Sequence, residues 1–477
     1  MYLKKIYFLL FFYSMTCFSI KKNIQTDTLL YQEKYKWIIT NKTKLTDLTN
    51  IELEKNEIDS VFYIILKKLE NNGYPFSTIE FRYDSLQKDK IYGKLFLEKG
   101  SFTKIDSIAI KGYNKFPKYL ITRFLKIKIN ENYSQNKIDS ISKKIQSNVF
   151  LKESQKNSVL FNKEQTILFL YLEKKHNNSI DGFLGFNNNQ GEPSLYGRVN
   201  LNLSNAINMW ESIKIKWNKL TENSQELSLN FNFPFFLNSN FFLNTEFNIL
   251  QYENTYINKE FISTLQVKKK NNFLKLGYLN KRSSTTHNSL NNSIQDYRKN
   301  LILFNWTNKK TDFSKNKMNY RISKEYRIGF IKNTNKKNVR QKIALNLECK
   351  IPLFENNNFY LNSNNEFLIG ENILENEKIG VGGINQIRGF LENSFFSKSL
   401  SLIRLENKYF FSNDSYFSFF YDFGSLYDLN VKLESFGLGI GIDMENDIFL
   451  INYAIPKYNK NIEINNSKIH FNYILKF

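Results

Sequence analysis

The chain ends in KIHFNYILKF, residues 468–477, and this stretch decides the fold. Every odd position from Ile469 onward is apolar, and the final residue, Phe477, is aromatic. Successive side chains of a β-strand point to opposite faces. The stretch therefore predicts a strand with one apolar face, on which Phe471 and Tyr473 lie beside Phe477.

The same alternation extends back through the chain to residue 179. In Leu195–Leu203 and Gln225–Phe233, Leu, Val and Phe alternate with Asn, Ser and Arg over strands of roughly ten residues. A β-sandwich also alternates, but we expect shorter strands and faces rich in Val, Ile and Leu. Aromatic faces opposite Asn, Ser and Gly are typical of a transmembrane barrel, apolar outside and polar inside.

Composition agrees with a barrel. Aromatic residues make up 16% of the 477 residues, yet the mean hydropathy is −0.45. After the N-terminus there is no apolar run of about 18 residues, so no transmembrane helix is predicted. We count about 16 alternating segments between Ile180 and Phe477, and an even number returns both ends of a barrel to one side. The predicted fold class is mainly β: a transmembrane antiparallel β-barrel of about 16 strands over residues 178–477, preceded by two small α+β domains.

The formal net charge of +22 leaves the partner open. Nucleic acid, an anionic membrane surface and a lysine-biased genome all account for such an excess, but no nucleic-acid motif accompanies the scattered lysines. The two cysteines, Cys17 and Cys349, and three dispersed histidines show no zinc spacing. No nucleophile motif or phosphate-binding loop occurs. We expect no metal, no cofactor, no nucleic-acid partner and no enzymatic activity.

The N-terminus has the pattern of a secretory signal peptide. Two lysines precede a short apolar run, Ile6–Tyr13, and Cys17-Phe18-Ser19 offers a small-x-small cleavage site. Lipoprotein processing through Cys17 is the alternative. We expect a signal peptide at residues 1–19 and export of the mature chain.

Residues 20–177 alternate between helix-like and strand-like segments, which form a weak internal repeat. The first unit, residues 20–100, has an expected strand, helix and two strands at Tyr35–Thr40, Ile58–Leu69, Thr78–Tyr83 and Lys90–Leu97. The second unit, residues 101–177, has an expected strand, two helices and a hairpin at Ile105–Ile110, Lys118–Phe124, Gln135–Gln146, Ser158–Leu160 and Thr166–Leu172. Both units predict strand–helix–helix–strand–strand domains.

An arginine in a glycine-rich loop is the candidate functional residue. Arg388 lies in GVGGINQIRGF, residues 380–390, within a long gap between predicted strands that extends from Glu371 to Ser397. In the two strands that follow, alternation assigns Glu406 and Asp422 to the lumen face. A guanidinium between two carboxylates forms charge-assisted, bidentate hydrogen bonds.

These residues resemble a known family. Ile387-Arg388-Gly389-Phe390, after Gly382-Gly383, resembles the Val-Arg-Gly-Phe/Tyr signature of the BamA/TamA superfamily of outer-membrane assembly factors, with Ile387 in place of valine. Phe420–Gly424 matches the Phe-x-Asp-x-Gly strand motif, and Phe477 resembles the C-terminal assembly signal. The order of elements in residues 20–177 resembles POTRA domains, the periplasmic modules of these proteins.

The resemblance implies that the loop folds into the barrel lumen, where its arginine meets acidic residues of the wall. We predict that Glu406 and Asp422 hold Arg388 there. A purely structural lock is the alternative to a functional one.

The resemblance further implies a protein of the outer membrane that inserts or translocates clients without ATP, with POTRA-like domains in the periplasm. Expected partners are unfolded outer-membrane or secreted proteins, membrane lipid or lipopolysaccharide, and accessory periplasmic proteins or lipoproteins. Clients would add strands at a seam between Ile180–Asn187 and Lys468–Phe477, where Gly182 and Gly185 lower pairing strength. A two-partner-secretion translocase for one dedicated partner and a passive porin-like barrel are the alternatives.

Overall fold

The structure is a computed structural model of the chain. It describes residues 36–39, 52–87, 90–113, 115–175, 177–189, 192–221, 223–286, 293–310, 317–333, 336–412, 414–444, 447–459 and 461–477. The predicted signal peptide, residues 1–19, lies outside the described residues. Contacts divide the described chain into two compact units. One holds residues up to Ala109 with 128–143 and 157–169, and the other holds 110–127, 144–156 and 170–477. The domain boundaries expected from the sequence stay predictions.

The first unit contains a four-stranded sheet with a helix. Its elements are β1 (Lys36–Ile39), β2 (Glu52–Glu54), α1 (Lys55–Glu70), β3 (Thr78–Gln87) and β4 (Lys90–Glu98). The strand order is β2-β1-β4-β3, with β1 parallel to β4. Buried Ile58 of α1 packs with Leu95 of β4. The short strand β2 was not predicted, and any second helix between β1 and α1 would fall on residues outside the described range.

A second set of α+β elements follows. These are β5 (Lys104–Ile105), β6 (Ser107–Lys111), α2 (Lys118–Leu125), β7 (Glu131–Asn132), α3 (Gln135–Gln146), β8 (Leu151–Phe161) and β9 (Thr166–Lys174). Strands β6, β9 and β8 form a three-stranded sheet in that order. Both helices lie at the predicted positions. In α2, the apolar residues Leu120, Ile121 and Leu125 recur at helical spacing and are buried.

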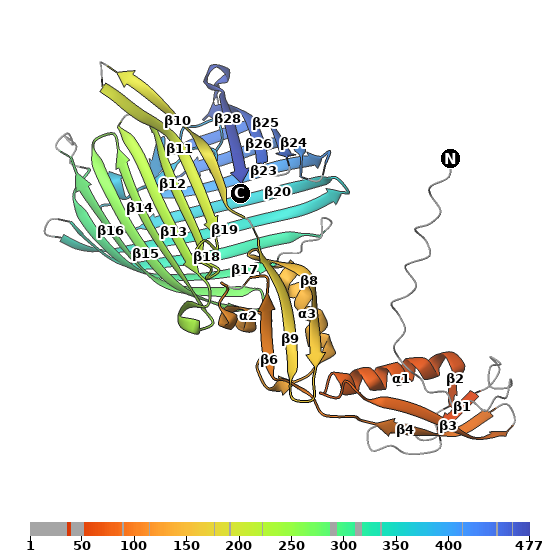
Figure 1. The fold of residues 1–477 in the computed structure, drawn as a ribbon. Helices are drawn as coiled ribbons and strands as arrows, with labels where there is room; N and C mark the ends of the chain where they lie inside the picture. The colour runs from red at the N-terminus through yellow and green to blue at the C-terminus, as the bar shows by residue number, and fades with distance from the viewer. Residues whose placement is uncertain are drawn as a thin grey trace. The chain divides into compact units, whose positions relative to one another are not determined.

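Most of the chain forms a closed antiparallel barrel, coloured yellow to blue in Figure 1. Within the described residues, sixteen long strands make up the wall. They are β10 (Ser179–Asn189), β11 (Glu192–Ser204), β12 (Ser212–Thr221), β13 (Ser224–Phe233), β14 (Phe241–Tyr252), β15 (Tyr256–Lys269), β16 (Asn272–Thr285), β17 (Tyr297–Lys310), β18 (Asn319–Asn333), β19 (Lys336–Phe354), β20 (Asn357–Ile369), β23 (Ser399–Phe410), β24 (Tyr416–Leu426), β25 (Val431–Met444), β26 (Asp447–Tyr458) and β28 (Lys468–Lys476). A two-residue strand, β27 (Asn461–Ile462), extends the β26 edge, and short 3-10 turns follow β13 (Phe236–Asn238) and β27 (Ile464–Asn466). The predicted closed barrel is confirmed.

Period-two alternation sets the two faces of the wall. On β24, Phe417 and Phe419 are exposed on the outer face, while Ser418, Phe420 and Asp422 are buried on the inner face. An apolar outer face therefore encloses an inner face that carries charged and amide side chains. None of the helices in the described ranges has the length and hydropathy of a membrane span.

Candidate lumen loop and strand seam

The segment between β20 and β23 packs against the inner wall of the barrel. It contains a 3-10 turn, η3 (Glu375–Glu377), and a two-stranded sheet of β21 (Ile379–Val381) and β22 (Phe395–Ser397). This lumen loop, defined as residues 371–397, buries several of its apolar side chains against the wall. They form one cluster with strand residues: Val381, Ile387, Phe390, Leu400, Leu402, Leu426 and Leu433.

Glycines allow the loop to turn back on itself. Gly382 and Gly383 have φ values of 123° and 93°, and the Gly383 N–H donates to the Phe390 carbonyl at 3.1 Å. A Cβ on Gly382 would lie 2.0 Å from the Leu391 carbonyl oxygen, so no other residue fits there. Gly389, with a φ of 87°, contacts Pro456 of β26. The turn presents Arg388 to the wall.

The structure brings Arg388 and Asp422 together as a buried, bidentate pair. The Arg388 Nε and Nη2 groups donate to the two Asp422 carboxylate oxygens at 2.8 and 2.7 Å, and its backbone N–H donates at 3.1 Å. Arg388 is 2% exposed and Asp422 is 0% exposed. Three hydrogen bonds from one residue fix both its side chain and its backbone on β24.

Glu406 completes the predicted lock with a longer contact. Arg388 Nη1 lies 3.3 Å from Glu406 Oε2, and the guanidinium carbon lies 3.5 Å from the ring centre of Phe420. Arg404 Nη1 donates to the loop carbonyl of Asn385 at 2.9 Å, and its Nε lies 3.7 Å from Asp422. Asp422 therefore accepts most of the hydrogen bonds from Arg388, and Glu406 is the weaker partner.

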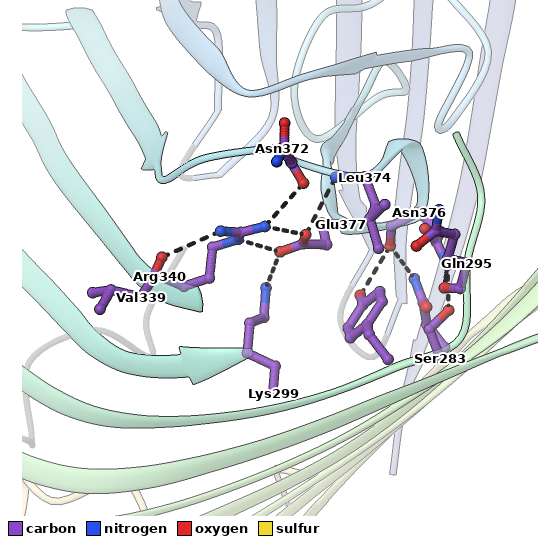
Figure 2. Close-up of polar contacts among 11 residues, drawn as sticks. Ser283, Gln295, Lys299, Val339, Arg340, Asn372, Leu374, Asn376 and Glu377 are labelled. Carbon is purple, nitrogen blue, oxygen red and sulfur yellow. Dashed lines mark hydrogen bonds and ion pairs between the residues drawn. The ribbon is translucent and has the colours of Figure 1, made fainter. Parts of the chain in front are cut away.

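A second buried ion pair holds the other end of the loop, and sequence reasoning missed it. Figure 2 shows Glu377 of η3 facing Arg340 of β19. The Arg340 Nε and Nη2 groups donate to Glu377 at 2.9 and 3.0 Å, while Lys299 Nζ of β17 lies 3.7 Å away. Alternation along the strands places Arg340 and Lys299 on the inner face, so this pattern could have marked them as candidates. Alternation cannot identify the loop residue that contacts them.

Asn376 adds neutral hydrogen bonds to this second anchor. Its side-chain amide donates to Ser283 Oγ and to the Gln295 carbonyl, both at 2.8 Å. Its carbonyl accepts from Asn258 Nδ2 and the Tyr297 hydroxyl, both at 3.0 Å. The loop is thus tied to β15, β16, β17 and β19 at one end and to β23 and β24 at the other.

Barrel closure depends on a short strand pairing. Among the described residues, β10 and β28 share three paired positions, Ser179↔Lys476, Ile180↔Leu475 and Asp181↔Ile474. Next to them, Asn178 and Phe477 exchange two backbone hydrogen bonds of 3.2 and 3.0 Å. By contrast, β28 pairs with β26 over eight positions, Asp447↔Leu475 to Ala454↔Lys468. The pairing stops at Gly182, whose φ is 138° and whose added Cβ would lie 1.9 Å from the Arg198 carbonyl oxygen.

Of the two glycines of the predicted seam, only Gly182 borders the paired positions. Gly185 lies beyond the last paired position, and extending the observed register would place it opposite His470. Gly185 still packs closely, since an added Cβ would meet the Tyr196 ring at 2.4 Å. Phe471 and Tyr473 of the last strand and Phe477 after it are exposed.

Among the described residues, no group of His, Cys, Asp or Glu is arranged to hold a metal ion.

Comparisons with solved structures identify the architecture. A structure of BamA from Haemophilus ducreyi lacking POTRA domains 1–3 matches with a TM-score of 0.56 over 92% of this chain and 98% of that one, at 14% identity. The fold is that of BamA and CdiB. CdiB from Acinetobacter baumannii matches at 0.55 and 12% identity, covering 90% and 84% of the two chains. CdiB from Escherichia coli matches at 0.55 and 10% identity, covering 95% and 93%. Neither protein-family models nor curated proteins match the sequence. The BamA-type fold thus emerges from structure, with little sequence identity to support it.

Proposed function

We propose that this chain is an outer-membrane protein of the BamA/TamA superfamily that inserts or passes client proteins by strand addition at the β10–β28 seam. The two α+β regions act as POTRA-like domains in the periplasm. The free energy of client folding drives the process, so no ATP is needed. Clients are unfolded outer-membrane or secreted proteins, with membrane lipid and accessory periplasmic proteins as further partners.

The single observation that carries this proposal is the three-position seam. Past Gly182, the β10 edge that faces β28 has no described pairing, and neither does β28 from Lys468 to Tyr473 on its β10 side. Unpaired strand edges offer N–H and C=O groups to an incoming strand. A short seam costs few hydrogen bonds to open, because each contributes only about 0.5–1.5 kcal/mol net.

The anchored lumen loop argues against a passive porin-like barrel. A loop tied to the barrel wall at two places by buried ion pairs occupies the lumen that an open porin needs. A client-handling barrel, by contrast, benefits from a filled lumen because the membrane stays sealed while strands exchange at the seam.

A translocase for one dedicated partner remains the second candidate. BamA and CdiB structures match this chain almost equally, at TM-scores of 0.56 and 0.55. The fold therefore does not choose between a general insertase and dedicated secretion, and client identity must be measured.

Depletion of the protein followed by outer-membrane proteomics tests the proposal. Broad loss of outer-membrane proteins indicates general insertion, loss of one exported protein indicates dedicated secretion, and an unchanged proteome contradicts both. Arg388→Ala should insert and still impair client assembly. Arg321→Ala is the matched control, because Arg321 forms only a half-exposed pair with Glu348 at 3.5 Å. Equal client levels in the two variants would make the lock purely structural.

A further inference from the structure

Five cations form a row across neighbouring strands of the barrel, one on each of β15–β19. Each lies directly opposite the next in the strand register. The pairs are Lys259↔Arg282, Arg282↔Arg298, Arg298↔Lys332 and Lys332↔Lys337. At about 4.8 Å per strand, this cation row spans roughly 19 Å.

The cation row lies on the outer face of the wall. Its members are exposed, whereas the adjoining residues Asn258, Ser283, Lys299 and Ile331 are buried on the inner face. Exposed apolar side chains share the outer face farther along the same strands, among them Leu276 and Ile302. The row also lies near the barrel end opposite the start of β10, because it is close to the start of β15 and the end of β16.

Among the described residues, no ion pair joins a member of this row to an acidic side chain. Like charges directly opposite each other on paired strands destabilise a sheet. The ion pairs formed by other cations in the described parts of these strands involve Lys299, Arg321, Arg327, Arg340 and Lys342. A nearby acid, Asp296, accepts hydrogen bonds from the Thr285 N–H and hydroxyl at 2.6 and 2.8 Å. An external anion would remove the repulsion.

An apolar groove lies on the same outer face. It has a volume of about 710 Å³ and is lined by Leu265, Leu276, Phe304, Trp306 and Ile343, among others. Arg282 and Leu276 are six residues apart on β16, which is roughly 20 Å along a strand. For a strand tilted by about 40°, that is a depth of about 15 Å, half of a bilayer core of about 30 Å.

We propose that the cation row and the groove bind a phosphorylated membrane lipid, with phosphates on the row and an acyl chain in the groove. The inference rests on the membrane placement proposed above, which puts the row in the outer leaflet. A row of this length exceeds one phosphate, so it favours a lipid with two. A free phosphate would leave the groove empty, whereas an acyl chain that extends about 15 Å in depth from the row reaches the groove at Leu276.

The test uses purified full-length protein in zwitterionic detergent. Native mass spectrometry measures binding of bisphosphorylated lipid A, of the same lipid without phosphates, and of inorganic phosphate. The row variant combines Arg282→Gln, Arg298→Gln and Lys332→Gln. The control removes three charges at the opposite end of the same wall, with Lys269→Gln, Lys270→Gln and Lys310→Gln. Heat-dependent gel mobility verifies that each variant is folded.

The wild type and the control should bind the bisphosphorylated lipid equally, and the row variant should bind it roughly 100-fold more weakly. Equal affinity in both variants would overturn the site, as would equal binding of the phosphate-free lipid. Full competition by inorganic phosphate would show a free-phosphate site instead. Flotation with liposomes is measured separately: failure to float contradicts the membrane placement, whereas flotation without phosphate-dependent binding contradicts only the lipid site.

Discussion

At the scale of a single residue, Arg388 shows how a loop side chain becomes fixed against the barrel wall. Its guanidinium takes both oxygens of a fully buried carboxylate and also lies over the Phe420 ring. A lysine would supply the charge without the planar fork that binds both Asp422 oxygens. Glu377 and Arg340 form the same bidentate geometry with the charges exchanged between loop and wall.

A double-mutant cycle measures the Arg388 lock. Arg388→Ala and Asp422→Ala should each lower the free energy of unfolding by about 3–5 kcal/mol, because each leaves a buried charge without its partner. The double variant should lose less than the sum, with a coupling of about 0.5–3 kcal/mol. Urea unfolding in lipid vesicles provides the values. The half-exposed pair Arg321–Glu348 is the control, with an expected coupling of about 0–1 kcal/mol. Additive losses at Arg388 and Asp422 would rule out the lock.

Gly182 and Gly185 should respond differently to alanine. A Cβ at Gly182 meets backbone at 1.9 Å and forces a side chain onto a φ of 138°, whereas a Cβ at Gly185 meets a movable tyrosine ring. We expect Gly182→Ala to destabilise the barrel by about 1–3 kcal/mol and Gly185→Ala to cost less. Unfolding curves of the two variants in lipid vesicles check this order. The reverse order would contradict the argument that the backbone contact at Gly182 is the more costly one.

At the scale of elements, the strand register determines what the seam can do. β28 is held along its length by β26 but by β10 at only three positions. The strand at the end of the chain is therefore fixed on one side and has a largely open edge on the other, which is the arrangement that strand addition needs.

Disulfide trapping tests the seam. In a Cys349→Ser background, Ile180→Cys with Leu475→Cys should cross-link, since directly opposite antiparallel residues have a Cα separation of about 4.5–5.5 Å, within disulfide range. Gly185→Cys with Asn472→Cys should remain reduced, because the register does not pair them. Non-reducing gels measure both. Efficient linkage of the second pair alone would show that the seam has a different register.

At the scale of the whole molecule, the lumen loop is anchored to several strands of the barrel wall. One anchor joins it to β17 and β19, and a second joins it to β23 and β24. A third anchor joins it to β12, where Lys216 and Asn218 donate to Glu392 of the loop at 2.6 and 2.7 Å. Loss of one anchor leaves the loop tethered by the others, so the lumen should remain filled until all three are removed.

Conductance in planar bilayers tests this arrangement. The wild type should conduct little, and Glu377→Gln or Arg388→Ala alone should raise conductance only slightly. These two substitutions combined with Glu392→Gln should raise it well beyond the sum of the single effects, because the loop has then lost its ion pairs with β12, β19 and β24. A control with Arg321→Ala should match the wild type. Porin-like conductance in the wild type would contradict a filled lumen.

Much of the fold could be predicted from the sequence, because alternation with period two is a local property. It placed the barrel strands, and it put Glu406 and Asp422 on the inner face without any knowledge of their neighbours. The arginine loop was marked by its glycines, whose conformational freedom is intrinsic to the residue. The spacing of apolar residues was sufficient for α2 and α3 in the same way.

Only the tertiary structure decided which distant residues meet. Alternation assigns a residue to a face but not to a partner, so the pairing of Glu377 with Arg340, the cation row across β15–β19 and the stop at Gly182 depended on inter-strand register. Register arises from closure of the whole sheet, when hydrogen bonding around the ring fixes each strand against its neighbours. The sequence alone determines which face of a strand each residue occupies, and closure of the barrel determines which distant residues contact one another.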